Sequence, residues 1–462
     1  MRRAALILLL VGGLLTACGG GHDKPKVAPS PPPPHTPPMP STVRPIYVSV
    51  LDGDTKEPVR GAVVRLAGRG DRVSRHGVAR FVGRQAVFSV TASARAYNAR
   101  TVPISFKKHY WRRIFIYRRD LQWPMYGVTP TRTQAQTHIR VRPPFRHVWS
   151  RGIGSLVEFP AVVSDGLAYI TNFHGTIRAI SMRDGTVAWS RFTWDKMAAS
   201  PAVVGQTLVV HSMDGNVWVL DRWNGRVIWH DHIGSPIESS PIVRDGIDYF
   251  GAWNGVIYAL DLNRHRLRWT HATGAKITSS VAIAGNTLYI GDYAGRLWAL
   301  YVRSGRTRWT GGVNGRIYGT PAVAGGRVFV PSSDGNSLTA FSVTGARRWR
   351  IVTGNYVYSS PAVWGGRVYF GSYDGNLYAA SARTGRVAWR AYAGGAISGA
   401  AVVVDGIVYA GSTANRIIGV DARSGRTVFR FPHGEYVPVS GDGARLLLHG
   451  YSRLYAVEPK RQ

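Results

Sequence analysis

A large aromatic residue recurs every 40 residues through most of the chain. The positions are Trp149, Trp189, Trp229, Trp269, Trp309, Trp349 and Trp389, and Phe429 takes the next place. A second column runs in the same period through Gly185, Gly225, His265, Gly305, Gly345, Gly385 and Gly425. A period near 40 residues, with several short strands in each unit, is typical of β-propeller blades. The repeat therefore predicts an all-β fold in which each unit is one blade.

Each repeat has the pattern of short strands separated by turns. In one unit, residues 360–363 begin an innermost strand of small side chains, residues 367–370 form the next strand, and residues 387–389 form the outer strand. The recurring glycines fit turn positions that need a positive φ angle, which histidine adopts less readily. We expect the tryptophan of each blade to pack on the next blade, with His265 as a local exception.

The two ends of the repeat region predict how the ring closes. Seven complete units lie between Phe159 and Phe429, and residues 438–457 supply three more strands without an outer one. The missing outer strand is predicted at residues 145–149, ahead of the first unit. Pairing of the two ends would complete an eight-bladed β-propeller and remove its free sheet edges.

The first 45 residues have the composition of an export signal and a tether. Arg2 and Arg3 precede an apolar run that ends in Leu-Thr-Ala-Cys, so residues 1–17 are predicted to be a signal peptide. This ending resembles the bacterial lipobox, which implies lipidation of Cys18 and anchoring to the cell membrane. The alternative is an ordinary signal peptide with a chance cysteine. Residues 18–45, the lipidated cysteine and a proline-rich linker, favour the polyproline II conformation.

Short alternating strands then predict a small β-sandwich over residues 46–119. This stretch resembles the carboxypeptidase-regulatory-like β-sandwich, and the matching residues are Asp52, Pro58, 61–63, 77–81 and 90–92. The Gly-Tyr of that family is Ala96-Tyr97 here. The resemblance implies a spacer or adhesive module without catalytic residues.

Residues 120–462 form the predicted propeller domain. The stretch Trp123-Pro124-Met125-Tyr126-Gly127, then Pro130 and Arg132-Thr133, precedes repeats of the form Ser-Pro-Ala-Val…Tyr…Gly…Leu-Tyr-Ala…Gly…Trp. These motifs resemble the pyrroloquinoline-quinone-type (PQQ-like) propeller repeat. With the export signal and lipid anchor, they are also similar to the propeller lipoproteins of the outer-membrane β-barrel assembly machinery. That family has neither a proline-rich tether nor a sandwich module.

The resemblance to quinoproteins raises the question of a cofactor. Quinoprotein dehydrogenases typically hold the quinone between a tryptophan and a disulfide of adjacent cysteines, with calcium nearby, whereas this chain has one cysteine. The acidic residues before the predicted inner strands are Glu158, Asp195, Glu238 and Glu435, without a repeated ligand pattern. His230 and His232 share a strand face, but a solvated turn is the simpler interpretation. We therefore predict no cofactor, no metal site and no catalytic residues, and keep a PQQ-dependent dehydrogenase as an alternative.

Arginine accounts for most of the net charge and recurs in one type of turn. The chain has 58 Lys+Arg and 25 Asp+Glu, a net charge of +33. The turns before the outer strands hold a candidate anion-binding face of Arg183, Arg226, Arg266, Arg303, Arg306, Arg383, Arg386, Arg423 and Arg426. Turns of one type lie on one face of a propeller, so these cations would form a ring that attracts polyanions. The alternative is a general use of arginine as a surface residue.

A second candidate site lies on the opposite face, where loops converge on the predicted axis. Its residues are Lys196, Lys276, Arg316, Tyr318, Tyr356 and Tyr358. Neighbouring cations and aromatic rings at an axial mouth suit an anionic or peptide ligand. Ordinary rim decoration is the alternative.

Together these features predict a non-catalytic, lipid-anchored protein that is exported and faces the extracytoplasmic side of the membrane. We expect a monomeric binding or scaffold protein, with envelope proteins or anionic cell-wall or lipid polymers as partners and no nucleic acid. The alternatives are a PQQ-dependent dehydrogenase and an outer-membrane protein assembly factor.

Overall fold

The computed structural model describes residues 44–67, 70–83, 87–105 and 111–460. The predicted signal peptide and Cys18 lie outside these ranges, as does the tether before Arg44. Apart from one short 3-10 turn (Arg119–Leu121), every described element is a β-strand, so the all-β prediction is confirmed. Within the described ranges, no helix has the length and apolar character needed to span a membrane.

The first strands form two small sheets. The bounds are β1 (Arg44–Asp52), β2 (Val63–Leu66), β3 (Gly70–Val73), β4 (Val78–Gly83), β5 (Val87–Ser93), β6 (Arg100–Ser105) and β7 (Trp111–Ile116). One sheet has the order β4-β1-β7 and the other β3-β2-β5-β6. Ile46, Val48 and Val50 alternate inward along β1 and are buried. The sequence pattern missed β3, because all four of its residues are exposed and it has no apolar alternation.

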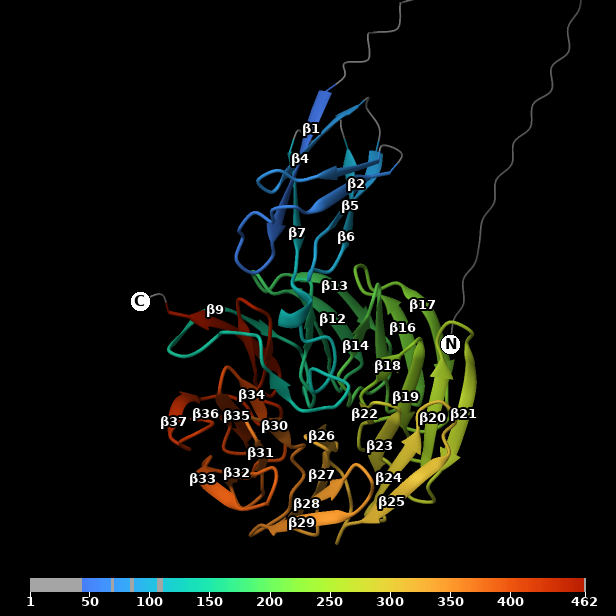
Figure 1. Cartoon of the computed structure of the whole chain (residues 1–462), viewed down its shortest axis with the longest axis vertical. Helices are drawn as coiled ribbons and strands as arrows, with labels where there is room; N and C mark the ends of the chain where they lie inside the picture. The colour runs from blue at the N-terminus through green and yellow to red at the C-terminus, as the bar shows by residue number, and fades with distance from the viewer. Residues whose placement is uncertain (1–43, 68–69, 84–86, 106–110, 461–462) are drawn as a thin grey trace, which may run out of the picture. The chain divides into compact units, whose positions relative to one another are not determined.

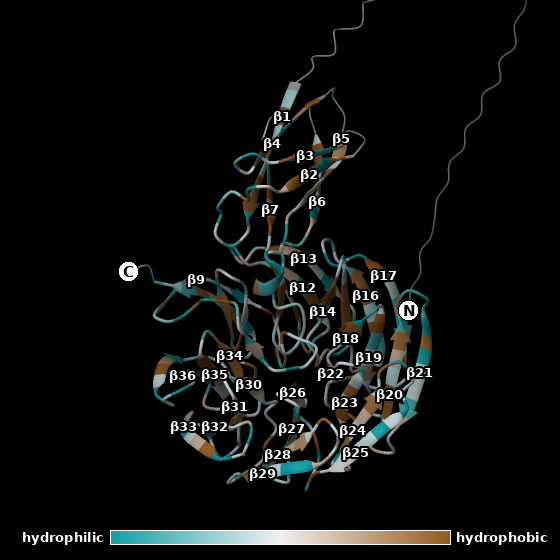
Figure 2. Ribbon diagram, viewed as in Figure 1, coloured by the Kyte–Doolittle hydropathy of each residue, from teal (hydrophilic) through white to brown (hydrophobic). Residues whose placement is uncertain are grey.

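Antiparallel four-stranded sheets follow one another along the rest of the chain (Figure 1). The first contains β10 (Val162–Ser164), β11 (Leu167–Thr171), β12 (Thr176–Ser181) and β13 (Val187–Phe192), ordered from inside to outside. The short inner strand is buried along its whole length, whereas four of six residues in β13 are exposed and one is buried. Figure 2 shows this gradient, with hydrophilic residues on outer strands such as β29 (Arg347–Val352).

The next sheets repeat this order with nearly constant bounds. The strands are β14 (Ala202–Val204), β15 (Thr207–His211), β16 (Asn216–Asp221) and β17 (Val227–His232); β18 (Ile242–Arg244), β19 (Ile247–Gly251), β20 (Val256–Asp261) and β21 (Arg266–Ala272); β22 (Ala282–Ala284), β23 (Thr287–Gly291), β24 (Arg296–Tyr301) and β25 (Thr307–Gly312). They continue with β26 (Ala322–Ala324), β27 (Arg327–Ser332), β28 (Ser337–Ser342) and β29; β30 (Ala362–Trp364), β31 (Arg367–Gly371), β32 (Asn376–Ser381) and β33 (Val387–Tyr392); β34 (Val402–Val404), β35 (Ile407–Ser412), β36 (Arg416–Asp421) and β37 (Thr427–Phe431).

The last sheet joins the two ends of the repeat region. Its order is β38 (Val439–Gly441), β39 (Leu446–His449), β40 (Arg453–Pro459) and β9 (Phe145–Gly152). In the register of β40 and β9, Ala456 faces Trp149, which is the pairing that the sequence predicted. His449 in this sheet accepts a hydrogen bond from the backbone N–H of Ala161 at 3.1 Å, next to the first inner strand. The ring is therefore closed both by strand pairing and by a buried histidine.

The recurring tryptophans connect each sheet to the following one. The indole Nε1 of Trp189 donates to the carbonyl of Arg222 at 2.8 Å. Trp149, one repeat earlier, and Trp269, two repeats later, make the equivalent bonds to Met182 and Val302. The ring of Trp189 also lies against the turn glycine Gly225, where an added Cβ would approach it to 2.5 Å. In the one repeat with histidine at this place, the His265 ring stacks on Trp229 at 4.6 Å between centroids. Stacking explains why the turn accepts a side chain there.

A segment ahead of the propeller strands runs around the axis and binds the inner strands. We name residues 123–136 the axial segment; it ends in β8 (Ala135–Gln136), which pairs in parallel with β34. Its carbonyls accept hydrogen bonds from the middle residue of successive inner strands, and the donors are the N–H groups of Val163, Val203, Ile283, Val323, Val363 and Val403. The segment thus satisfies backbone donors at the centre of the ring that no neighbouring strand reaches.

This backbone pattern omits the sheets of β18 and β38, and Arg132 of the axial segment reaches the first of them. Its buried guanidinium donates to the carbonyl oxygens of Ser240 and Pro241 at 3.0 and 3.1 Å, and also to the carbonyls of Val281 and Tyr126. Burial lowers the pKa of Arg132 to about 10. The side chain acts as a multidentate donor that fills the centre of the ring.

Candidate functional site

A chain of hydroxyl groups links the inner strands just above the axial segment. The backbone N–H of Ser200 donates to Ser240 Oγ, and the N–H of Ser240 donates to Ser280 Oγ. In the same way, the N–H of Ser280 donates to Thr320 Oγ1 and that of Thr320 to Ser360 Oγ, all at 2.8–3.1 Å. Every link spans 40 residues. Tyr126 of the axial segment donates its phenol to Ser360 Oγ at 3.0 Å. This chain of hydrogen bonds forms the floor of the axial cavity.

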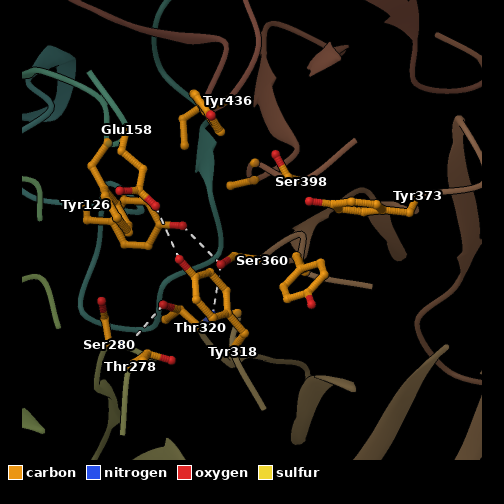
Figure 3. A pocket seen from close by; sticks show the side chains of 16 residues that line it. Tyr126, Glu158, Thr278, Ser280, Tyr318, Thr320, Ser360, Tyr373, Ser398 and Tyr436 are labelled. Atoms are coloured by element: carbon orange, nitrogen blue, oxygen red, sulfur yellow. Dashed lines mark hydrogen bonds between the residues drawn. The ribbon is translucent and has the colours of Figure 1, made fainter. Parts of the chain in front are cut away.

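The axial pocket is a cavity of about 260 Å³ above this floor (Figure 3). Five residues at equivalent positions of the 40-residue repeat form its walls, each on a different loop. They are Glu158, Thr278, Tyr318, Tyr358 and Ser398. Tyr373 and Tyr436 complete the rim. Because the loops approach one axis, residues far apart in sequence form one concave, tyrosine-rich surface.

The tyrosines of the pocket form a connected cluster. The ring centroids of Tyr318 and Tyr358 lie 5.3 Å apart in an edge-to-face arrangement, and those of Tyr358 and Tyr373 lie 5.0 Å apart. Tyr318 donates its phenol to Glu158 Oε1 at 3.2 Å, which joins the first and fifth sheets of the ring across the pocket. Edge-to-face packing holds such rings more rigidly than burial alone.

Two carboxyl groups of this region lie in poorly hydrated surroundings. Burial raises the pKa of Glu158, and the hydrogen bond from Tyr318 opposes the increase. Burial, together with repulsion from Glu158, raises the pKa of Glu238 to about 7, although Lys276 nearby acts in the opposite direction. Half-buried acids without compensation are unstable as carboxylates, so the pocket favours a ligand that stabilises their charge or accepts their proton.

Some polar atoms of the pocket make no hydrogen bond. They are Thr278 Oγ1 and Ser398 Oγ, both inaccessible to solvent. Glu238 Oε2, which lies outside the cavity lining, is a third such atom nearby. Thr278 is 5% exposed and lines the cavity. An unsatisfied buried polar group is costly, and in a cavity it marks a place for a polar ligand atom.

The residues predicted for the axial mouth separate into two groups. Tyr318 and Tyr358 line the pocket, and Tyr356 packs edge-to-face on Tyr358 beside it. The cations lie outside: Lys276 Nζ is 3.2 Å from the Trp253 ring centroid, and Arg316 pairs with Asp334 at 3.2 Å. Lys196 lies 5.9 Å from the Phe173 ring, and its backbone N–H binds Asp214. The tyrosines therefore belong to the pocket and the cations to its surroundings.

The predicted arginine face consists of exposed turns between third and outer strands. All nine arginines are exposed, and Arg183 pairs with Asp184 at 3.0 Å. The other eight form no ion pair with any residue that the structure describes; they are Arg226, Arg266, Arg303, Arg306, Arg383, Arg386, Arg423 and Arg426. These turns and the loops of the axial pocket lie at opposite ends of the strands. Anion binding by these turns stays a prediction.

His230 and His232, the histidines considered as metal ligands, make other contacts. The rings of His230 and Trp218 stack at 4.8 Å, and His232 Nδ1 is 3.0 Å from Asn216 Oδ1. Over residues 44–460, leaving aside the three undescribed gaps, no group of three or more His, Cys, Asp or Glu is placed to hold a metal ion. Cys18 lies outside the described residues. The sequence analysis noted Glu158 and Glu238 as acids without a repeated ligand pattern, and it missed Tyr373, Tyr436 and Thr278. The 40-residue repeat could have identified Thr278, because it occupies the same repeat position as 158, 238, 318, 358 and 398.

The fold and the pocket define a closed β-propeller with a ligand-sized cavity on its axis. The chain belongs to the family described as outer membrane protein assembly factor BamB, whose model matches residues 146–246 and 253–461. A comparison with curated proteins found no match.

Solved structures with the same fold include proteins of very different roles. BamB from Moraxella catarrhalis is 18% identical, with a TM-score of 0.59 over 69% of this chain and 99% of that one. The computationally designed Ika8 protein is 17% identical, with a TM-score of 0.59 over 68% of this chain and 99% of that one. Quinohemoprotein alcohol dehydrogenase from Comamonas testosteroni is 14% identical, with a TM-score of 0.64 over 74% and 82%. At these identities the likeness concerns the fold alone.

The axial pocket does not fit a pyrroloquinoline quinone. This cofactor is a tricarboxylate, so its site needs cationic partners. The side chains that line the pocket include Glu158 and, among the described residues, no lysine or arginine. The Glu158 carboxylate would repel the carboxylates of the quinone, and the neutral phenols around it cannot supply the missing positive charge.

Proposed function

We propose that the chain is a non-catalytic binding scaffold of the cell envelope, exported and anchored by a lipid on Cys18. Membership of the BamB family supports an envelope role of the assembly or scaffold type. The observation that carries the proposal is the axial pocket, a rigid concave surface with unsatisfied polar atoms. Such a pre-formed surface suits binding because little side-chain freedom is lost when a partner docks.

The test is capture of envelope proteins by the full chain after chemical crosslinking. Ser398→Trp places a large side chain in the pocket, and we expect it to lose the partners that the native chain retains. Ala388→Trp, on the exposed side of β33, is the matched control and should retain them. Equal capture by Ser398→Trp and the native chain would exclude the pocket as the binding surface.

The anchor has its own test. Cells fed a labelled fatty acid should incorporate label into the native chain and not into Cys18→Ser. Labelling of the serine variant would contradict the proposed attachment site.

The exposed arginine turns favour a second candidate function, the binding of an anionic envelope polymer. Eight unpaired guanidinium groups on one face attract polyanions through an interaction that salt screens. We expect the native chain to elute from immobilised polyphosphate at higher salt than a variant with Arg303, Arg306, Arg383 and Arg386 changed to glutamate. A reversal of four exposed arginines at the other end of the described chain, Arg60, Arg72, Arg75 and Arg80, changes the net charge equally and should change elution less. If both variants elute at the same salt concentration, net charge alone explains the binding, and the arginine turns are not a specific anion-binding face.

A further inference from the structure

Most of the few glutamates in this strongly basic chain lie at the axial mouth. The chain has five glutamates, and Glu158, Glu238 and Glu435 all lie in loops that approach the axis. The other two are Glu57, which is exposed, and Glu458, which is ion-paired. With a net charge of +33, a chance cluster of unpaired acids is not expected.

The acids of the mouth have no cationic partner within the described structure. Some acids elsewhere have one: Asp165 pairs with Arg222, and Glu458 pairs with Arg146 and Arg445. Others, such as Asp292 and Asp442, form no ion pair with any described residue and accept hydrogen bonds from N–H groups instead. At the mouth, Glu158 accepts the phenol of Tyr318, and Lys276 acts on Glu238 from a longer distance. Glu158, Glu238 and Glu435 take part in none of the ion pairs between described residues. Lys276 and Arg316 are engaged by Trp253 and Asp334 instead. The carboxyl groups are therefore left for a cation that comes from outside the chain.

The aromatic wall suits the same class of ligand. The faces of tyrosine rings attract ammonium groups, and the attraction grows when the site is shielded from water. Tyr318 and Tyr373 line the same cavity as Glu158 (Figure 3), and Tyr358 lines it too. Thr278 Oγ1 and Ser398 Oγ, which have no hydrogen-bond partner, supply acceptors for the N–H groups of such a ligand.

The size of the pocket limits what enters it. Its volume of about 260 Å³ is below the range of roughly 300–1,000 Å³ typical of sites for drug-sized ligands. The space suits one long side chain or a small amine. A hydroxyl-rich neutral ligand would also meet aromatic rings and hydroxyls, but it would leave the desolvated carboxyl groups without a counter-charge.

We propose that the axial pocket binds an alkylammonium group, with Glu158 of its wall as the charge partner and Tyr318, Tyr358 and Tyr373 as its aromatic enclosure. Glu238, which lies beside the pocket within electrostatic range of Glu158, adds negative charge. This inference rests on the proposed binding function and names the chemistry of the partner. Two sources share that chemistry: a lysine side chain of a partner polypeptide, and a free amine.

The experiment is calorimetric titration of the full chain with three probes. They are a lysine blocked at both ends of its backbone, the diamine cadaverine, and the same blocked lysine acetylated on Nζ. We expect an ammonium probe to bind and the acetylated probe to bind at least tenfold more weakly. Binding of blocked lysine without cadaverine supports a polypeptide source, and the reverse supports a free amine.

Charge-removing variants test the assigned residues. The double variant Glu158→Gln, Glu238→Gln should lower the affinity for the ammonium probe at least tenfold, while Glu57→Gln on the sandwich should bind as the native chain does. Each single variant should have an intermediate effect, which keeps the test valid if the double variant does not fold. Unchanged affinity in the folded double variant would overturn the proposal.

The pH dependence separates an ammonium from a neutral ligand. The charged groups that act on Glu238 are Glu158 and Lys276, and burial raises the pKa of Glu238 to about 7. Ammonium affinity should therefore rise between pH 6 and pH 8 as the carboxyl ionises. Flat binding across this range, equal binding of the acetylated probe, or no binding of either ammonium probe would overturn the proposal. If capture of envelope partners still depends on Ser398, the proposed function survives that result.

Discussion

At the scale of single residues, a few side chains in the centre of the ring supply hydrogen-bond donors to buried backbone carbonyls that no strand pairs with. Arg132 is the clearest case, since its guanidinium binds four backbone carbonyls from the axial segment and two inner strands. No carboxylate is among its hydrogen-bond partners, so carbonyl dipoles surround the cation, and Asp248 acts on it from a longer distance. Its planar fork of donors suits this role better than the compact ammonium of lysine.

We predict that Arg132→Leu lowers the free energy of unfolding by about 4 kcal/mol, because it leaves buried carbonyls without donors. Arg132→Lys should cost about half as much, since one ammonium reaches fewer of them. Denaturant unfolding followed by tryptophan fluorescence measures both. Equal stability of Arg132→Leu and the native chain would show that the carbonyls find other donors.

Single residues also show where sequence reasoning stops. The sequence identified Glu158 and Glu238 as unusual acids, and the repeat placed Tyr318 and Tyr358 near the axis. The hydrogen bond from Tyr318 to Glu158 joins residues 160 positions apart, on opposite sides of the ring. Such a pairing depends on ring closure and on side-chain directions, which a column of residues does not specify.

At the scale of elements, the turn before each outer strand shows how one repeat accommodates the next. Its glycine has a positive φ angle and lies against the preceding tryptophan. The period of 40 predicted both the turn and the packing. It did not predict the axial segment, which has no internal period and whose partners are spread over more than 200 residues, or β3, which has no apolar face.

Two glycines of one sheet separate backbone strain from packing: Gly225 in the turn before the outer strand β17, and Gly205 in the turn between β14 and β15. Gly225 and Gly205 have φ angles of 70° and 58°, but an added Cβ meets Trp189 at 2.5 Å only at Gly225. Gly205→Ala should cost about 1 kcal/mol of stability for the backbone alone, and Gly225→Ala about 3 kcal/mol because the tryptophan must also move. Thermal unfolding of the two variants measures the difference. Equal losses would mean that the tryptophan contact yields without cost.

At the scale of the whole molecule, the closure of the ring depends on a neutral histidine. His449 is buried, accepts from the N–H of Ala161 and faces the carbonyl of Pro438 at 3.3 Å. Burial lowers its pKa to about 4. Below pH 6.5 the unfolded chain binds a proton that the folded chain does not, so this group stabilises the fold above pH 6.5 and loses that contribution as the pH falls toward 4.

We predict that the stability of the native chain falls by up to about 3 kcal/mol between pH 6.5 and pH 4 through this group. The interval from pH 6.5 to pH 5 is the most informative, because most carboxylates are still ionised there. His449→Gln keeps a donor and an acceptor without titrating, and should show a flatter profile in this interval. A profile as steep as that of the native chain would assign the pH dependence to other groups.

The axial segment also constrains the order in which the molecule can be assembled. Residues 123–136 leave the ribosome before any propeller strand, yet their hydrogen-bond donors extend to Val403, near the end of the chain. This early stretch must wait for most of the later sequence before it can settle. The hydrogen bonds at the centre of the ring therefore join the first residues of the propeller to some of its last, and they can be completed only late in synthesis.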